Sequence, residues 1–150
     1  MLDVDRIQQA LTAHPVTTID EKTLQPAAVL LPLFVSEGED ALLFTRRTEN
    51  LNHHRGEIAF PGGKHQAEDA DLLDTALRET EEEVGIRPED VTVLGRLDDF
   101  VSIHDYRVSP FVGLIPWPYE LRVNPQEISE VFDVPLPTLS DPAIFRHAAG

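Results

Sequence analysis

Three glutamates near the middle of the chain have the spacing of metal ligands on one helix. Glu79, Glu82 and Glu83 stand at positions i, i+3 and i+4, so a helix would gather their carboxylates within an arc of about 100°. Like charges this close repel one another. A hard divalent cation such as Mg²⁺ would offset the repulsion because it binds carboxylate oxygens. The alternative is that the run from Glu81 to Glu83 is a solvated charged surface.

A pair of glycines upstream supports the metal interpretation. In Phe60-Pro61-Gly62-Gly63 the two glycines carry no side chain, so the backbone can approach a metal ion or a phosphate closely. The helix that follows presents its N-terminal dipole, which favours anions. The corner and the helix together predict a site for a cation and a phosphorylated ligand.

The helix that must position the glutamates is predicted from Asp69 to Val84, with acidic residues in its first turn and Gly85 where a helix would stop. Glu81 projects away from the other glutamates and is expected to be exposed. The stripe that would face the core consists of Leu73, Ala76, Leu77, Thr80 and Val84.

The remaining pattern combines a second helix with several strands. A helix is predicted at residues 3–13, where apolar residues recur at helical spacing. Strands are predicted at 27–35, 41–47, 91–97, 108–115 and 131–134, with a short strand at 58–60 inside the loop 48–63. Loops this long in a compact domain are usually functional. With 150 residues and no internal repeat, the chain is predicted to form one α/β domain over residues 1–150.

Composition excludes several classes of function. The chain has no cysteine, which excludes disulfides, thiolate catalysis and cysteine zinc sites. A formal net charge of −15 argues against nucleic acid as a partner, although a divalent metal can still hold a small phosphorylated ligand. The N-terminus has no secretory pattern, and the apolar run 27–35 is shorter than the about 20 residues that span a bilayer. We therefore expect a cytoplasmic protein with no membrane partner.

The glycine corner and the acidic helix resemble the Nudix box. Gly63 is followed by Arg78-Glu79-Thr80-Glu81-Glu82-Glu83-Val84-Gly85-Ile86, which is similar to the family's glycine, spaced acidic residue, Arg-Glu-x-x-Glu-Glu-x-Gly and aliphatic residue. One position departs from the pattern. Asp69 is separated from Arg78 by eight residues, and Ala70 occupies the strict register of the spaced acidic residue. The resemblance implies an α/β/α sandwich with a mixed β-sheet, and hydrolysis of a nucleoside diphosphate linked to another group.

A second stretch resembles the signature of the coenzyme A pyrophosphatase branch of that family. It runs from Leu43-Phe44-Thr45-Arg46-Arg47-Thr48 through Gly56 to the glycine corner. Phe44, Thr48 and Asn52 depart from the residues usual in this signature. The resemblance implies coenzyme A as the leading substrate.

The same resemblance implies roles for the acidic residues. Glu79 and Glu83 would bind Mg²⁺ or Mn²⁺ most directly, Glu82 would assist, and the Gly62 carbonyl would add a ligand. A carboxylate must also orient or deprotonate the attacking water. The candidates are Glu82 and, from a later loop, Glu127, for which a surface role is the alternative.

Cations are expected to bind the anionic groups of the substrate. Basic residues gather before the glycine corner in an otherwise acidic chain, and they would suit the diphosphate and the 3′-phosphate of coenzyme A. The predicted substrate-binding residues are Arg46, Arg47, His54, Arg55 and Gly63, with His53 in the same basic group.

Similar proteins continue into another helix that covers the second face of the sheet, whereas 14 residues follow Leu136 here. This C-terminal covering helix is therefore expected to be absent. The N-terminal helix, a partner subunit or missing residues must then cover that face. We predict a homodimer or a truncated chain.

Three functions stay open at this point. The first is hydrolysis of coenzyme A to 4′-phosphopantetheine and adenosine 3′,5′-bisphosphate. The second uses the same metal chemistry on another nucleoside diphosphate derivative, such as ADP-ribose or a dinucleotide. The third is a Nudix-like domain that binds a nucleotide without cutting it.

Overall fold

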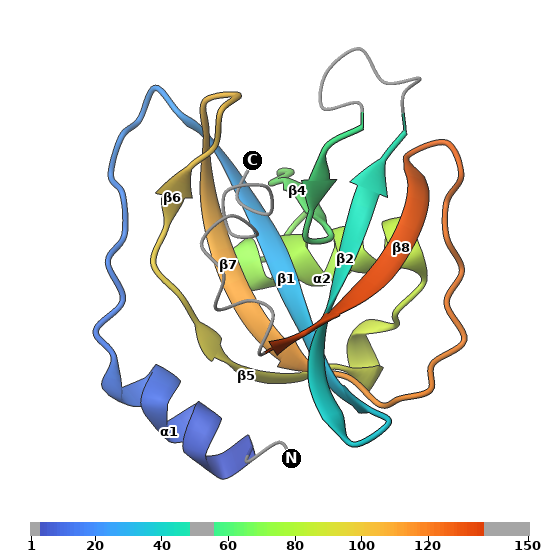
Figure 1. The fold of residues 1–150 in the computed structure, drawn as a ribbon. Coiled ribbons are helices and arrows are strands. Elements are labelled where there is room, and N and C mark those ends of the chain that lie inside the picture. Colours follow the sequence, from blue (N-terminus) through green and yellow to red (C-terminus); the bar gives the residue numbers. More distant parts are fainter. Residues whose placement is uncertain (1–3, 49–55, 137–150) are drawn as a thin grey trace.

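The computed structural model describes residues 4–48 and 56–136 of the chain. Within these ranges, eight strands form one mixed sheet whose main path has the order β3-β2-β1-β7-β5 (Figure 1). The strands are β1 (Gln25–Ser36), β2 (Glu39–Arg47), β3 (Ile58–Ala59), β4 (Gly62–Lys64), β5 (Thr92–Arg96), β6 (Phe100–Val101), β7 (Tyr106–Leu114) and β8 (Ile128–Pro135). The helices are α1 (Val4–Ala13), α2 (Leu72–Val84) and the short 3₁₀ helix η1 (Pro88–Asp90).

Strand β1 holds the sheet together because it pairs with three neighbours. It runs parallel to β7 along its length, from Gln25 opposite Tyr106 to Leu33 opposite Leu114. Its first half pairs antiparallel with β4, whereas its second half pairs antiparallel with β2. The sheet therefore divides along β1, and β2 diverges from β7 toward the upper end of the molecule in Figure 1. The predicted mixed sheet and α/β class are confirmed.

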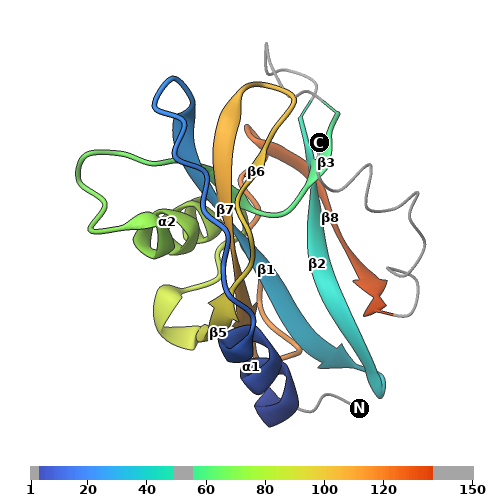
Figure 2. The same ribbon diagram turned by 90° about the vertical axis from the view of Figure 1, so that its left-hand side faces the viewer.

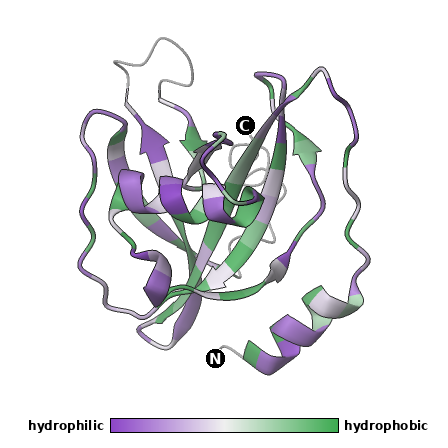
Figure 3. Ribbon diagram, turned by 180° about the vertical axis from the view of Figure 1, so that it is seen from behind, coloured by the Kyte–Doolittle hydropathy of each residue, from purple (hydrophilic) through white to green (hydrophobic). Residues whose placement is uncertain are grey.

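Helix α2 lies across one face of the sheet, close to β1 and β7 (Figure 2). Its side chains Ala76 and Leu73 pack with Ala28, Leu30 and Phe111. Seen from behind, much of its outward surface is hydrophilic (Figure 3). The predicted apolar stripe therefore faces the core, and Glu81 is exposed as expected.

The predicted start of this helix at Asp69 is wrong, since α2 begins at Leu72. Asp71 caps it, because its carboxylate accepts a hydrogen bond from the Asp74 backbone N–H at 2.8 Å. At the other end Gly85 has φ 79°, and its N–H donates to the Glu81 carbonyl at 2.9 Å. A left-handed residue of this kind ends many helices, so the predicted stop at Gly85 is confirmed.

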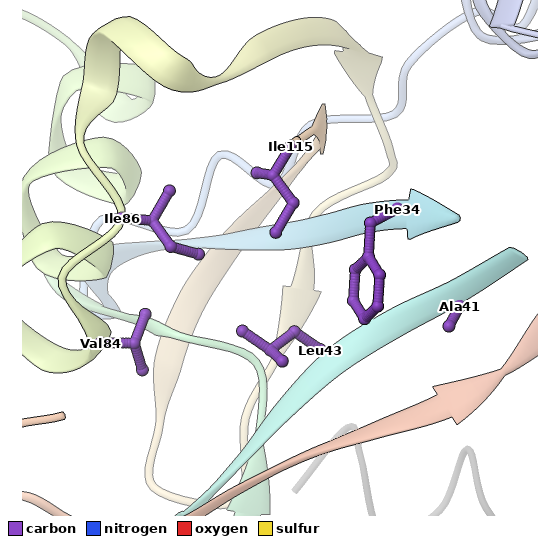
Figure 4. Packing of buried hydrophobic residues seen from close by; sticks show 6 residues of the cluster. All are labelled: Phe34, Ala41, Leu43, Val84, Ile86 and Ile115. Atoms are coloured by element: carbon purple, nitrogen blue, oxygen red, sulfur yellow. The ribbon is translucent and has the colours of Figure 1, made fainter. Parts of the chain in front are cut away.

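The C-terminal end of α2 is fixed by a second cluster. Val84 and Ile86 pack with Phe34, Ala41, Leu43 and Ile115 from β1, β2 and the segment after β7 (Figure 4). All six side chains are nearly or fully buried. Burial of this size stabilises the fold by roughly 1.5–3 kcal/mol for each large apolar side chain. The last turn of the helix, which carries Glu82 and Glu83, is thereby anchored to the sheet.

Helix α1 packs on the other face of the sheet. Its Val4, Ile7 and Leu11 contact a cluster that includes Leu33 and Leu94. The sequence predicted that the N-terminal helix, a partner subunit or missing residues cover this face. The N-terminal helix covers at least a part of it. The expected lack of a C-terminal helix concerns residues 137–150, which lie outside the described residues. Among the described helices, none has the length and apolar character needed to cross a membrane.

Candidate active site

A pocket of about 420 Å³ opens where β1 parts from β2. Its floor comes from β1, β6 and β7, and its other walls come from β3, β4, α2 and the loop before β8. Four of the residues predicted as metal ligands or catalytic acids line it, namely Gly62, Glu79, Glu82 and Glu127. These four residues are as much as 65 positions apart in the sequence.

Glu79 lies directly against the glycine corner. Its carboxylate contacts Gly63 so closely that a methyl group there would overlap the Oε2 atom. Burial raises the pKa of Glu79 to about 7, helped by its hydrogen bond with Glu82 and by the charge of Glu127. The absence of a side chain at Gly63 is therefore what lets this acidic group reach the backbone of β4.

Glu83 is the most buried of the helix glutamates, with 1% of its side chain exposed. Its Oε1 accepts a long hydrogen bond from the Gly62 N–H at 3.4 Å, and its Oε2 lies 3.6 Å from Arg47 Nη1. Burial raises the pKa of Glu83 to about 8, and the nearby charges of Glu79 and Glu127 act in the same direction. The site therefore holds a fully buried acid, Glu83, beside a partly buried one, Glu79, and the ionised form of each lies near one arginine, Arg47 or Arg78.

Arg78 orients Glu82 and is itself held by Asp69. Its Nη1 lies 3.2 Å from Glu82 Oε2 and 3.1 Å from Glu79 Oε1. Its Nε and Nη2 donate to the two carboxylate oxygens of Asp69 at 2.7 and 3.0 Å. Asp69 is buried, and this bidentate pair holds the pKa of its carboxyl well below the usual range. Asp69, which stands out of register in the sequence motif, thus acts on the glutamates through Arg78.

The two arginines at the end of β2 differ in position. Arg47 lines the pocket, and its buried Nε has no hydrogen-bond partner within the described ranges. Arg46 is outside the pocket lining, where its guanidinium pairs with Glu130 at 3.4 Å and donates to the Gly56 carbonyl at 3.2 Å. A substrate-binding role for Arg46 stays a prediction. His54 and Arg55 lie outside the described residues, as does His53.

Glu127 enters the pocket from the loop before β8. The loop is tied to the end of β2, because the Thr48 N–H donates to the Glu127 carbonyl at 2.9 Å and the Thr48 hydroxyl donates to the Gln126 carbonyl at 3.1 Å. Its charge contributes to the raised pKa of both Glu79 and Glu83. Glu127 therefore lies close enough to affect both helix glutamates, although it comes from a separate loop.

Several lining residues were not predicted from the sequence. They are Glu57, Lys64, Gln66, Phe100, Ser102 and Tyr106. Lys64 could have been noticed as the cation that directly follows the double glycine. Phe100, Ser102 and Tyr106 could not, because only strand pairing brings β6 and β7 beside β1.

The residues fit a divalent cation in chemistry. Hard ions bind carboxylate oxygens, and the two glutamates with raised pKa values would be relieved of their mutual repulsion by such an ion. Among the residues that the structure describes, no group of three acidic or histidine side chains is close enough together to hold a metal ion. The carboxylates are apart because Glu82 pairs with Arg78 and Glu83 accepts a hydrogen bond from the Gly62 N–H.

Comparisons with known proteins agree on one family. A family model described as "NUDIX domain" matches residues 23–148. A Photorhabdus laumondii protein named "Uncharacterized Nudix hydrolase NudL" is 43% identical over 133 residues, covering 89% of this chain and 70% of that protein. A Yersinia enterocolitica protein of the same name is 46% identical over 110 residues, covering 73% of this chain and 56% of that protein. The chain thus matches a little over half the length of this second relative.

The fold is also similar to that of a solved structure. A Caenorhabditis elegans Ap4A hydrolase in a binary complex superimposes with a TM-score of 0.63 at 20% identity, covering 74% of this chain and 80% of that one. At this identity the likeness concerns the fold alone.

Proposed function

Because the chain belongs to the Nudix family, we propose that it hydrolyses the diphosphate of coenzyme A or a derivative, giving 4′-phosphopantetheine and adenosine 3′,5′-bisphosphate. The observation that supports hydrolysis best is the convergence of Glu79, Glu82 and Glu127 on one pocket beside the glycine corner, with Glu83 buried behind them.

Glu79 and Glu83 would hold Mg²⁺ or Mn²⁺, with Glu82 and the Gly62 carbonyl as further ligands. When bound, the ion would neutralise charge on the diphosphate and polarise a phosphoryl oxygen. Arg78 keeps Glu82 beside Glu79, and Asp69 keeps Arg78 in place. Arg78 therefore fixes the positions of Glu79 and Glu82, and an ion would draw the ligands together when it binds.

Glu127 is the better candidate to orient the attacking water and take its proton. Glu82 is already engaged by Arg78 at 3.2 Å, whereas Glu127 lines the same pocket from the loop before β8. In the reaction, the water oxygen forms a bond to one phosphorus as the bridging P–O bond breaks, and the proton passes to the carboxylate. Glu82 is the alternative base.

Arg47 would bind the diphosphate itself. It is the guanidinium in the pocket lining, and its buried Nε has no hydrogen-bond partner in the described part of the chain. Arginine binds phosphate oxygens through parallel N–H donors. When the substrate binds, the N–H groups of Arg47 that lie near Glu83 would donate to the phosphate oxygens instead.

Coenzyme A is proposed as substrate because residues 43–63 resemble the signature of the coenzyme A branch. The rival substrates are ADP-ribose and dinucleotides. All of these substrates contain a phosphoanhydride bond next to the 5′-phosphate of adenosine, so the metal chemistry would be the same.

The decisive experiment is a substrate panel in which coenzyme A, dephospho-coenzyme A, ADP-ribose and Ap4A are incubated with Mg²⁺ or Mn²⁺, and products are identified by mass. Reactions in ¹⁸O water locate the attacked phosphorus, and EDTA and Glu83→Gln serve as controls. Metal-dependent 4′-phosphopantetheine is the expected product. If the protein cleaves ADP-ribose but not coenzyme A, coenzyme A is rejected as the substrate. If no compound gives a metal-dependent product, a domain that only binds nucleotides is favoured.

A further inference from the structure

The pocket has two ends with different chemistry. One end carries the glutamates of α2 and Glu127, whereas the other is lined by apolar and aromatic side chains of β1, β6 and β7. These are Ala27, Val29, Phe100, Tyr106 and Val108. A metal and a diphosphate would occupy only the acidic end, so the apolar end is available to another part of the substrate.

Ser102 gives this apolar end a directed hydrogen-bond donor. Its hydroxyl oxygen accepts from the backbone N–H groups of Tyr106 at 3.1 Å and His104 at 3.3 Å. A hydroxyl has two acceptor positions and one donor. Both acceptor positions are thus used within the turn, and Ser102 can offer its proton to an acceptor atom of a ligand.

A carboxylate stands beside this donor. Glu57 lines the pocket, and its Oε1 lies 2.8 Å from His104 Nε2, in the same turn as Ser102. A carboxylate can accept several hydrogen bonds at once. Ser102 thus contacts the backbone of His104 and Glu57 contacts its ring, and both line the pocket, so a donor and an acceptor are available there for a ring nitrogen and an amino group of a base.

Lys64 lies between the two ends. It follows Gly63, which contacts Glu79, and its Nζ lies 5.6 Å from the centre of the Tyr106 ring. From the acidic end onward, the order is thus carboxylates, cation, aromatic ring. A nucleotide has the matching order of metal-bound diphosphate, phosphorylated sugar and aromatic base.

We propose that the end of the pocket formed by Phe100, Ser102 and Tyr106 binds the base of an adenine nucleotide, and that Lys64 contacts a phosphate on its sugar. The base would pack against the Tyr106 ring, accept a hydrogen bond from Ser102 at a ring nitrogen and donate its amino group to Glu57. This rests on the proposed function in one respect, namely that the metal and the diphosphate occupy the acidic end.

The test is equilibrium binding of 5′-AMP in the presence of Mg²⁺. AMP has no diphosphate, so binding is measured without turnover, and its outcome does not depend on whether coenzyme A is cleaved.

Tyr106→Leu removes the ring and Tyr106→Phe keeps it. Ser102→Ala removes the donor and Ser102→Thr restores it, while Ser129→Ala removes a serine hydroxyl that bonds the Arg46 carbonyl outside the pocket. Thermal unfolding of each variant shows that it is folded.

We expect Tyr106→Leu to raise the dissociation constant of AMP about ten-fold, because contact between a base and an aromatic ring is worth about that factor. Tyr106→Phe, Ser102→Thr and Ser129→Ala should bind as the wild type does. Ser102→Ala should weaken AMP about five-fold. Inosine 5′-monophosphate should bind more weakly than AMP, because it has an exocyclic carbonyl oxygen in place of the amino group, and this oxygen would face the Glu57 carboxylate.

Lys64 is tested by comparing adenosine 3′-monophosphate with adenosine. Lys64→Met should weaken binding of adenosine 3′-monophosphate and leave adenosine unchanged, because only the former carries a sugar phosphate apart from the diphosphate position. The base site is overturned if AMP does not bind saturably, or if a folded Tyr106→Leu variant binds AMP as the wild type does. It is also overturned if 4′-phosphopantetheine, rather than AMP, loses affinity in Tyr106→Leu, since the amide chain would then occupy this end.

Discussion

Glu83 combines two requirements that conflict in the metal-free protein. A ligand for a hard cation must be ionised, yet this side chain is 1% exposed and lies near the charges of Glu79 and Glu127. Burial without a full counter-charge is costly for a carboxylate. Sites with this arrangement lower the stability of the protein but support its activity. Removing the charge should therefore raise stability and lower activity.

We predict that Glu83→Gln abolishes hydrolysis but stabilises the metal-free protein at pH 8 by about 1–2 kcal/mol. The pKa of Glu83 is raised from its ordinary value of 4.5 to about 8. Between these values the folded state holds more protons than the unfolded state, so wild-type stability falls as pH rises through this window. Thermal unfolding in EDTA from pH 5 to pH 8.5 measures the effect.

The matched control is Glu81→Gln, which removes a carboxylate from the exposed side of the same helix. It should leave the pH dependence unchanged. If Glu83→Gln and the wild type lose stability equally over this pH range, Glu83 is not held in a conflicting environment.

Glu127 and Glu82 can be separated by kinetics. We predict that Glu127→Gln lowers kcat about 100-fold, because a positioned base contributes at least about that factor, while Mn²⁺ binding is retained. Glu82→Gln should weaken Mn²⁺ binding as well as kcat, because Glu82 lies beside Glu79 and Arg78. Steady-state kinetics and manganese titration by electron paramagnetic resonance provide both readouts. The reverse pattern would assign the base to Glu82.

At the scale of elements, the site depends on how closely α2 approaches β4. Gly62 and Gly63 have different neighbours, although they are adjacent. A methyl group at Gly62 would overlap the backbone of β1 at Ala28 and Val29, whereas a methyl group at Gly63 would overlap only the Glu79 carboxylate. Backbone cannot move aside cheaply, but the end of a side chain can.

We therefore predict opposite effects for two similar substitutions. Gly63→Ala should displace Glu79 and lower kcat about 100-fold, since misplacement by about 1 Å can cost this much, with little loss of stability. Gly62→Ala should lower the free energy of unfolding by about 1–3 kcal/mol, because it forces β4 away from β1. Chemical denaturation and kcat measured on both variants provide the comparison. Equal losses of stability would mean that the corner responds as one unit.

The helix and the positions of its glutamates could be predicted because their information is local. The spacing of Glu79, Glu82 and Glu83 fixes their directions on a helix, and Gly85 marks its end. The start was misplaced because Asp69 and Asp71 are both acidic residues suited to a first turn. Only the structure separates the residue that caps the helix from the residue that binds Arg78.

The apolar end of the pocket could not be predicted, because it depends on pairing between distant strands. Tyr106 and Val108 line it beside Ala27 only because β7 runs parallel to β1. The periodicity of residues 106–114 predicts a strand but not its neighbour. Arg46 and Arg47 gave a similar difficulty, since adjacent cations in a strand project to opposite sides and the sequence does not say which one faces the ligand.

At the scale of the whole molecule, the two faces of the sheet are covered in different ways. Helix α2 covers one face and carries Glu79, Glu82 and Glu83, whereas α1 covers part of the other with Val4, Ile7 and Leu11. Gly95 on β5 lies so close to Leu11 that a side chain there would need α1 to shift. The N-terminal helix is therefore fitted to this face, and the predicted homodimer, if it forms, would bury what α1 leaves exposed.

Net charge should govern how fast an anionic substrate arrives. The chain carries a formal charge of −15, so the field of the whole molecule repels a diphosphate even though Arg47 and Lys64 attract it inside the pocket. Salt screens distant charges more than near ones, because the Debye length is about 8 Å at physiological ionic strength.

We predict that kcat/KM rises roughly two- to five-fold as ionic strength increases from about 20 to about 150 mM at constant free Mg²⁺. Replacing exposed acids far from the pocket, such as Glu89 and Glu120, with glutamine should flatten this rise. A steep fall of kcat/KM with salt would mean instead that the local cations control the approach of the substrate.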